Sequence, residues 1–180
     1  PFPFVEKGYT FVHPTWSPDG NRLYFATDLP SPESQGGIDL WYSDRNGTFW
    51  EEPINLGPTI NTSGDEVFPS FDADGTLYFS SNGHPSLGGL DIYSTQRLST
   101  NIEPQRNWRD GDVWSAPLRL PFPVNTLSDD HSFAIAPNGQ SGFISSDRSG
   151  IDKIYQVKLL ETPQIFEFKT LSAKTNHIVP

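Results

Sequence analysis

The chain has 180 residues, and its 22 acidic and 12 basic side chains give a formal net charge of −10. Nucleic acid and anionic membrane surfaces favour a basic face, so this charge balance argues against both as partners. The sequence has no cysteine, which excludes disulfides and thiolate metal sites, and no apolar run approaches the roughly 18 residues of a membrane-spanning helix. We therefore expect one sizeable domain without direct membrane insertion.

Proline and glycine are abundant, with 17 and 15 residues, and no long helical pattern is present. Together with many aromatic residues, this composition predicts an all-β fold of short strands joined by tight turns. The chain starts at Pro1 rather than at methionine and shows no signal peptide. We therefore expect a processed chain or a fragment of a longer protein.

The first repeat spans residues 13–66, after a segment, 1–12, that we assign to the end of a preceding unit. Residues 17–20 read Ser-Pro-Asp-Gly, in which proline presets φ, aspartate bonds to the nearby backbone and glycine takes the left-handed conformation. The next run, 23–25, is apolar without alternation, which predicts a strand covered on both faces. A third strand is expected in residues 36–43, a segment that begins with two glycines.

Two further copies follow the same order. The second spans 67–131 and contains an insertion, 99–111, and the third spans 132–161. Their opening turns end in Gly75 and Gly139, which are expected to adopt the left-handed conformation in the same way.

A fourth element joins successive copies, because residues 49–66 match 113–130. Each repeat thus supplies four short antiparallel strands that need neighbours on both faces, which predicts β-propeller blades, about three to four in this chain. The matched residues are Trp50 with Trp114, Pro53 with Pro117, Leu56 with Leu120 and Asn61 with Asn125.

The residues at 17–20, 77–81 and 88–93, which read SPDG, LYFSS and GGLDIY, resemble the PD40 (WD40-like) β-propeller repeat of TolB-like proteins. The likeness covers about 11–157, and the second copy is most similar to the propeller segment of Bacteroidetes OmpA-family envelope proteins associated with type IX secretion. In the third copy, Asn138 stands in place of the turn aspartate. The resemblance implies a propeller placed between other domains, in the periplasm, at the outer membrane or outside the cell.

Three repeats are too few to close a ring of about four to eight blades. We therefore expect either a longer parent protein or an assembly of chains, and we favour a fragment of a larger propeller. Residues 162–180 are interpreted as the outer strand of the last blade or as a linker to a following domain.

Residues that recur in every copy are expected to be structural. Asp39, Asp91 and Asp152 each follow a glycine-containing turn and are interpreted as strand-start hydrogen-bond acceptors. The spacing from aspartate to tyrosine is shorter in the second copy (Asp91 to Tyr93) than in the first (Asp39 to Tyr42). The third copy has the longer spacing of the first (Asp152 to Tyr155), so the difference predicts a bulge or register adjustment in one of these two classes of strand.

Paired acids recur at 65–66 and 129–130. Adjacent carboxylates serve acid–base catalysis or cation binding in some sites, but recurrence favours a structural role at the entry to a strand. The sequence at 72–75, Asp-Ala-Asp-Gly, is a weak calcium motif because it lacks the later ligands of an EF-hand loop. No metal, cofactor or catalytic residue is therefore assigned.

The insertion at 99–111 is the strongest candidate for partner binding, since it breaks the repeat. It holds basic and aromatic residues, the types enriched at binding hot spots, within an acidic protein. The structural alternative is a solvated loop whose tryptophan caps the blade. The candidate residues are Arg97, Arg106, Trp108 and Arg109.

These features predict a non-enzymatic binding or scaffolding module of a bacterial cell envelope that engages one or more protein partners. A glycan is the alternative ligand, which would make the chain a carbohydrate-binding propeller. The rival enzyme class is a hydrolase with an accessory propeller, although no nucleophile-elbow motif is present in the sequence.

Overall fold

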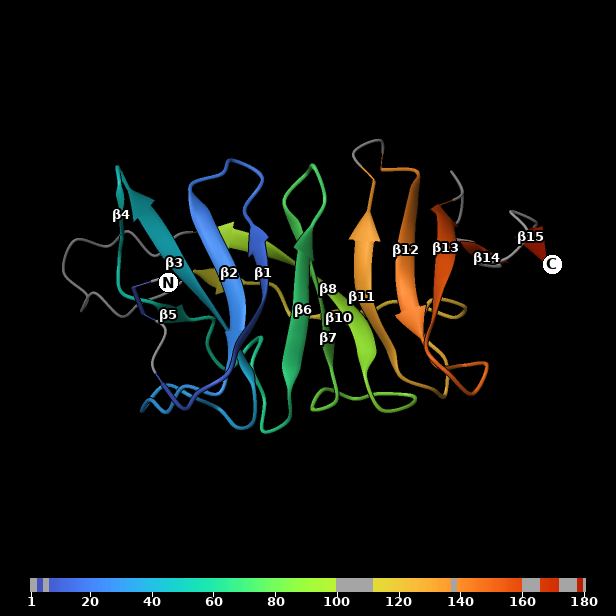
Figure 1. The fold of residues 1–180 in the computed structure, drawn as a ribbon, viewed down its shortest axis with the longest axis horizontal. Coiled ribbons are helices and arrows are strands. Elements are labelled where there is room, and N and C mark those ends of the chain that lie inside the picture. Colours follow the sequence, from blue (N-terminus) through green and yellow to red (C-terminus); the bar gives the residue numbers. More distant parts are fainter. Residues whose placement is uncertain are drawn as a thin grey trace.

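The computed structural model describes residues 3–4, 7–99, 112–136, 139–159, 166–171 and 178–179. These residues contain strands and turns but no helix, which confirms the predicted all-β class. They form three antiparallel sheets that follow one another along the molecule in chain order (Figure 1).

The first three strands of each sheet follow one another in chain order, and each pairs with the next. The first sheet contains β1 (Phe11–Trp16), β2 (Arg22–Thr27), β3 (Asp39–Asn46), β4 (Phe49–Trp50) and β5 (Ile54–Asn55). The second contains β6 (Glu66–Phe71), β7 (Thr76–Ser81), β8 (Asp91–Ser99), β9 (Val113–Trp114) and β10 (Leu118–Arg119). The third contains β11 (Asp130–Ile135), β12 (Ser141–Ser146), β13 (Lys153–Leu159), β14 (Phe166–Leu171) and β15 (Ile178–Val179).

The outer strand of the first two sheets is broken into two short pieces. β4 and β5 both pair with β3, and β9 and β10 both pair with β8. Pro53 and Pro117 lie between the pieces, and proline has no N–H to donate to a ladder. β14 pairs with β13 without such a break, so residues 166–171 form the fourth strand of the third sheet.

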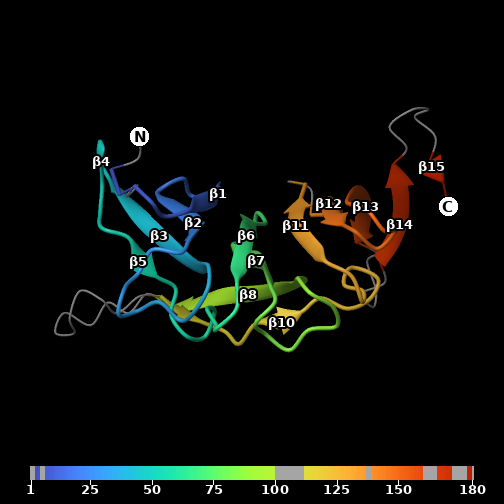
Figure 2. The same cartoon turned by 60° about the horizontal axis from the view of Figure 1, so that its bottom comes forward.

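The three sheets lie on an open arc, with β1, β6 and β11 on the inside and β5, β10 and β14 toward the outside (Figure 2). β6 contacts both β1 and β11, so the inner strands lie side by side. We call the contact between the first and second sheets the first seam, and that between the second and third sheets the second seam. The described residues show this arc and no closed ring.

The second and third strands of each sheet pair without a register shift, so the expected bulge does not lie there, and in the third copy the difference in spacing appears instead as a one-residue displacement of the aspartate. β2–β3 and β7–β8 pair without a shift, and each sheet instead carries a bulge in its first strand. The bulge residues His13, Phe68 and Ser132 have φ values of 53°, 54° and 57°. This left-handed conformation is uncommon for residues other than glycine, and its recurrence marks the bulge as part of the repeat.

The turn glycines behave as predicted. Gly20, Gly75 and Gly139 have φ values of 71°, 83° and 65°, in the left-handed region. Asp19 accepts a hydrogen bond from the backbone N–H of Asn21, which confirms its expected bond to the local backbone.

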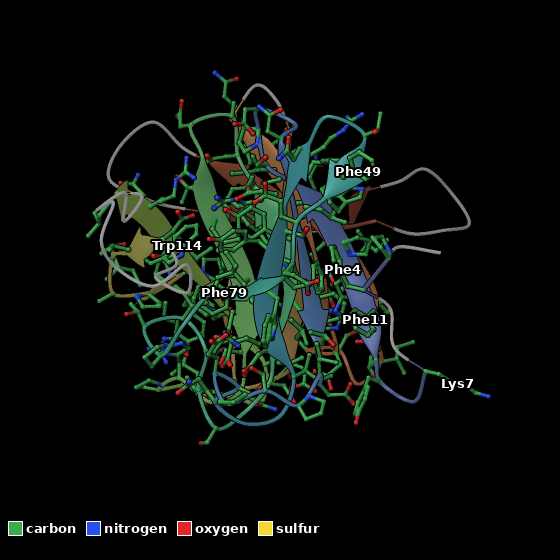
Figure 3. The ribbon with its side chains drawn as sticks, turned by 90° about the vertical axis from the view of Figure 1, so that its left-hand side faces the viewer. Phe4, Lys7, Phe11, Phe49, Phe79 and Trp114 are labelled. Carbon is green, nitrogen blue, oxygen red and sulfur yellow. The ribbon has the colours of Figure 1, made fainter. Side chains whose placement is uncertain are left out.

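Two apolar clusters fill the two seams. The first includes Tyr24 and Leu40 from the first sheet and Phe79 from the second, and Figure 3 shows Phe79 among the packed side chains while Lys7 projects outward. The second includes Ile92 and Ile144. Apolar strands covered on both faces, as predicted for the second strand of each repeat, are therefore confirmed in the first sheet.

The third sheet has the same register but one exposed face. The pairs Phe25–Trp41, Phe79–Tyr93 and Ile144–Tyr155 occupy equivalent places. This alignment places Ile154 at the position of Leu40 and Ile92. Leu40 and Ile92 are fully buried at the seams, whereas Ile154 is 58% exposed.

The same alignment corrects the expected equivalence of the three strand-start aspartates. Thr27 pairs with Asp39 and Ser81 with Asp91, but Ser146 pairs with Lys153. Asp152 lies one residue earlier, and its side chain is 73% exposed. The glycine-to-aspartate motif is displaced by one residue in the third copy, which moves the carboxylate out of the buried position.

Candidate functional site

The first acid of each recurring pair links two sheets. The backbone N–H of Ile38 donates to Asp65 Oδ1 at 2.9 Å, and that of Leu90 donates to Asp129 Oδ1 at 2.7 Å. Gly37 and Gly89 make this approach possible, because a Cβ there would lie 2.3 and 2.0 Å from the same carboxylate oxygens. These acids therefore hold each strand start against the preceding sheet.

The second acid of each pair is fully buried. Glu66 accepts hydrogen bonds from Thr62 and Ser81, all from neutral donors. Burial raises the pKa of Glu66. Asp130 accepts from Thr126 and, in addition, lies 2.5 Å from a guanidinium nitrogen of Arg148. The predicted structural role of both pairs is thus confirmed.

Asp39 and Asp91 also form hydrogen bonds within the fold. Asp39 Oδ2 accepts from the backbone N–H of Gln35 and from the Asn55 amide, and Asp91 Oδ2 accepts from the backbone N–H of Leu87. The other carboxylate oxygen of each aspartate is buried and has no hydrogen-bond partner. Burial raises the pKa of both carboxyl groups.

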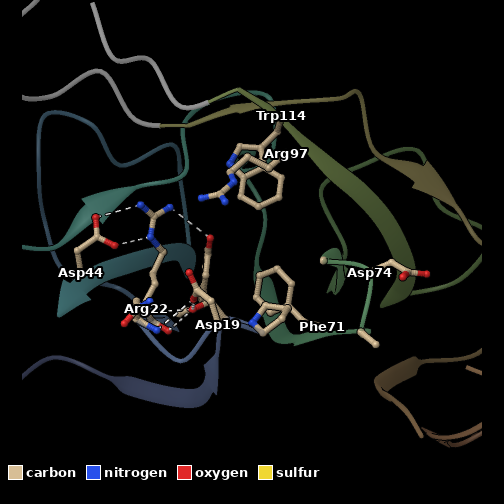
Figure 4. A pocket seen from close by; sticks show the side chains of 13 residues that line it. Asp19, Arg22, Asp44, Phe71, Asp74, Arg97 and Trp114 are labelled. Carbon is tan, nitrogen blue, oxygen red and sulfur yellow. Dashed lines mark hydrogen bonds and ion pairs between the residues drawn. The ribbon is translucent and has the colours of Figure 1, made fainter. Parts of the chain in front are cut away.

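The repeat is interrupted at one end of the first seam, where a pocket of about 270 Å³ opens between the two sheets (Figure 4). The turn between β1 and β2 and the turn between β6 and β7 form two of its sides, and residues of β2, β3, β6, β8 and β9 complete it. Its lining includes the side chains of Asp19, Arg22, Asp44, Phe71, Arg97 and Trp114.

Arg22 is fixed in the wall of this pocket. Its Nε and Nη2 lie 2.6 and 3.0 Å from the two carboxylate oxygens of Asp44, and its Nη1 pairs with Asp112. Its guanidinium carbon stacks 3.7 Å from the ring centroid of Tyr42. Burial lowers the pKa of Arg22, but its interactions with Asp44, Tyr24 and Asp112 together more than offset this and hold the pKa above its usual value. Arg22 therefore has little capacity left for a ligand.

The other groups of the pocket are more accessible. Arg97 is 44% exposed, and its Nη1 lies 3.5 Å from Asp112 Oδ2, the same oxygen that pairs with Arg22 Nη1. Figure 4 shows Arg97 beside Trp114. Hydrogen bonds from Ser17 and from the backbone of Asn21 lower the pKa of Asp19, which keeps its carboxylate ionised. Trp114, by contrast, is buried (5% exposed), and its indole N–H has no hydrogen-bond partner among the described residues.

This charged cluster belongs to one seam alone among the described residues. Arg22 pairs with Asp44 across β2 and β3, whereas the equivalent cross-strand pair in the second sheet is Thr76 with Gln96. Sequence reasoning missed Arg22 and Asp44 as site residues. The insertion was chosen because it departs from the repeat. The same criterion would have indicated Arg22 and Asp44, because the equivalent residues of the second repeat, Thr76 and Gln96, are uncharged.

The predicted binding insertion begins and ends beside the pocket. Arg97 pairs with Trp114 and Ser99 with Val113, so β8 and β9 form the base of the insertion 99–111. Of the four candidate residues, Arg97 lines the pocket. Arg106, Trp108 and Arg109 lie outside the described residues.

The described residues were also compared with the requirements of a metal site, a calcium loop and a membrane-spanning helix. Within them, no group of three or more histidine, aspartate or glutamate side chains is placed to hold a metal ion. Asp72 of the weak calcium motif accepts from the backbone N–H groups of Asp74 and Thr76 and from the Tyr78 hydroxyl, so it serves its own turn. In the same part of the chain, no helix has the length and apolar character needed to cross a membrane.

The chain matches no protein-family model. It also matches none of the curated proteins with which it was compared. The likeness to PD40 repeats therefore rests on the sequence motifs, and the family is a proposal.

Proposed function

We propose that the chain is a non-enzymatic binding or scaffolding module, built from PD40-type propeller blades, that mediates protein–protein interaction in a bacterial cell envelope. The observation that carries this proposal is the pocket at the end of the first seam, where charged residues replace the repeat pattern. Binding residues on turns and loops of a rigid β scaffold are a common arrangement.

The distribution of acids supports a binding role over acid–base chemistry. Asp65, Glu66, Asp129 and Asp130 are all engaged in holding sheets and strand starts. Asp19 and Arg97, whose side chains remain accessible, line the pocket, and Arg97 belongs to the base of the insertion. A partner that contacts the pocket therefore also meets the base of the insertion.

A pull-down from envelope extract tests the proposal, with the full chain as bait and the triple variant Arg106→Ala, Trp108→Ala, Arg109→Ala beside it. We expect the triple variant to lose the recovered partner, because arginine and tryptophan dominate interface energies. Arg45→Ala is the matched control, since Arg45 holds in β3 the register position that Arg97 holds in β8. Unchanged recovery with the triple variant would remove the insertion from the binding surface.

A glycan is the second candidate ligand, and one observation favours it. The rings of Phe71 and Trp114 line the pocket together with hydrogen-bonding groups of Asp19 and Asn21. Aromatic rings beside polar groups suit the mixed apolar and hydroxyl faces of a sugar. A glycan array on which the chain binds nothing would eliminate this alternative.

A further inference from the structure

We infer that the pocket at the end of the first seam binds the side chain of a lysine or arginine presented by a protein partner. The inference rests on the proposed binding function and names the chemistry that the pocket selects. It is argued from the charges, the rings and the buried donor that the pocket presents.

The charge of the pocket is negative. Asp19, Asp44 and Asp74 line it with Arg22 and Arg97, and the carboxylate of Asp112 contacts both arginines. Four carboxylates against two guanidinium groups favour a cation over an anion.

The arginines do not create an anion site despite their position. Arg22 is held by Asp44, Asp112 and the ring of Tyr42. Arg97 is the one exposed cation among the residues that line the pocket. Its Nη1 lies 3.5 Å from Asp112 Oδ2, and its charge contributes to the lowered pKa of Asp19. A carboxylate ligand would gain Arg97 but would face the surrounding acids.

The rings of the pocket suit the rest of a basic side chain. Phe71 and Trp114 provide apolar surface for an aliphatic stem, and the faces of aromatic rings attract cations, most strongly for tryptophan. A metal ion or free ammonium would use the charge but not this surface. The long stem of lysine or arginine uses both.

A second, independent feature indicates a peptide ligand. The indole N–H of Trp114 is buried at the pocket wall without a hydrogen-bond partner, and an unpaired buried donor is costly. Arg97 lies beside Trp114 in Figure 4. When Arg97 moves aside, a backbone carbonyl next to the bound basic residue supplies the acceptor that this donor lacks.

Titration of the ¹⁵N-labelled full chain tests the inference, with the indole N–H signal of Trp114 as the reporter. The probes are four blocked pentapeptides with lysine, arginine, glutamine or glutamate between pairs of glycines, and glucose as the sugar probe. We expect saturable shifts with the lysine and arginine peptides, which weaken as salt rises from about 20 mM to about 500 mM. The glutamine and glutamate peptides and glucose should cause none.

Two substitutions test the sign of the charge effect. Asp19→Asn keeps an acceptor for Ser17 and Asn21 and should weaken lysine-peptide binding about two- to fivefold. Arg97→Gln removes the competing cation and should strengthen it by a similar factor of about two to five. Asp152→Asn, at the exposed position just before β13, changes the net charge as Asp19→Asn does and should leave binding unchanged.

The opposite pattern would overturn the inference. Tighter binding of the glutamate peptide, or of glucose, would do so, as would weaker lysine-peptide binding in Arg97→Gln or no shift with any basic peptide. The pull-down is separable from this result. Peptide binding at Trp114 with no partner recovered in the pull-down would retain the pocket and refute the partner, whereas the reverse would retain the partner and refute the pocket.

Discussion

The two seams share their backbone contacts but use their cations differently. In each seam an asparagine amide brackets one residue of the third strand, Asn61 around Leu40 and Asn125 around Ile92, at distances of 2.7–3.0 Å. In the second seam, Arg119 and Arg148 lie beside the buried acids. In the first seam, the arginines are at the pocket instead.

The two buried acids of the first seam, Asp39 and Glu66, accept hydrogen bonds from neutral groups. Asp39 is held by Asn55 and a backbone amide, where Asp91 has Arg119 nearby. Glu66 is held by hydroxyl and amide groups, where Asp130 has Arg148. Among the described residues, no arginine lies beside these two acids of the first seam, and Arg22 and Arg97 line the pocket instead, where Arg22 is held by Asp44 and Asp112.

The largest expected effect separates the two buried second acids. Asp130→Asn deprives Arg148, whose side chain is 16% exposed, of this carboxylate and should lower the free energy of unfolding by about 3 kcal/mol. Glu66→Gln loses no cationic partner and should cost about 1 kcal/mol. Urea unfolding of both variants, with the slope unchanged, measures the difference. Equal losses would contradict the distinction between the seams.

The asparagine brackets should behave alike. Asn61→Ala and Asn125→Ala each leave the buried N–H of Leu40 or Ile92 without an acceptor, so each should cost about 2 kcal/mol. The carbonyls keep a partner, because Leu56 and Leu120 donate to them. Asn46→Ala, at an exposed position, is the control in the same experiment. A bracket that proves neutral in one seam would show that the backbone contacts are not equivalent.

The features of this fold that could be predicted are those set by residues adjacent in the sequence. Turn glycines and proline-broken outer strands depend on the chemistry of a few adjacent residues, so the sequence indicated Gly20, Gly75 and Gly139 and the match of Asn61 with Asn125. The bulge at Phe68 follows from packing of the inner strands against one another, for which no local residue type is diagnostic.

The site was predictable only in part. Arg97 was singled out for its place beside the insertion, and it lines the pocket. The pairing of Arg22 with Asp44 requires the register of two strands, and the contact with Asp112 joins residues that lie far apart in the sequence. Asp152 was misplaced because the motif match treated the three aspartates as equivalent. The spacing to Tyr155, one residue longer than that from Asp91 to Tyr93, carried the signal of a displacement that reverses the face of a side chain.

The smallest expected effect concerns pH and compares Asp39 with Asp91. Burial raises the pKa of both carboxyls, so the folded chain holds these protons more tightly than the unfolded chain. The stability that each contributes is present below about pH 4, the ordinary range of aspartate, and is lost as pH rises through the raised folded-state pKa. Because asparagine does not ionise, a substitution to asparagine removes this loss of stability at higher pH. Relative to the native chain, Asp39→Asn should therefore gain on the order of 1 kcal/mol between about pH 4 and about pH 7.

Asp91→Asn should gain less over the same interval, because Arg119 Nη1 lies 3.8 Å from Asp91 Oδ2 and favours the ionised carboxylate. Urea unfolding at several pH values measures both gains, and Asp152→Asn, whose carboxyl is exposed, controls for the loss of one negative charge. A gain for Asp91→Asn that equals or exceeds that for Asp39→Asn would mean that Arg119 does not compensate the buried acid. The contrast between a seam with internal cations and one without would then rest on Arg148 and Asp130 alone.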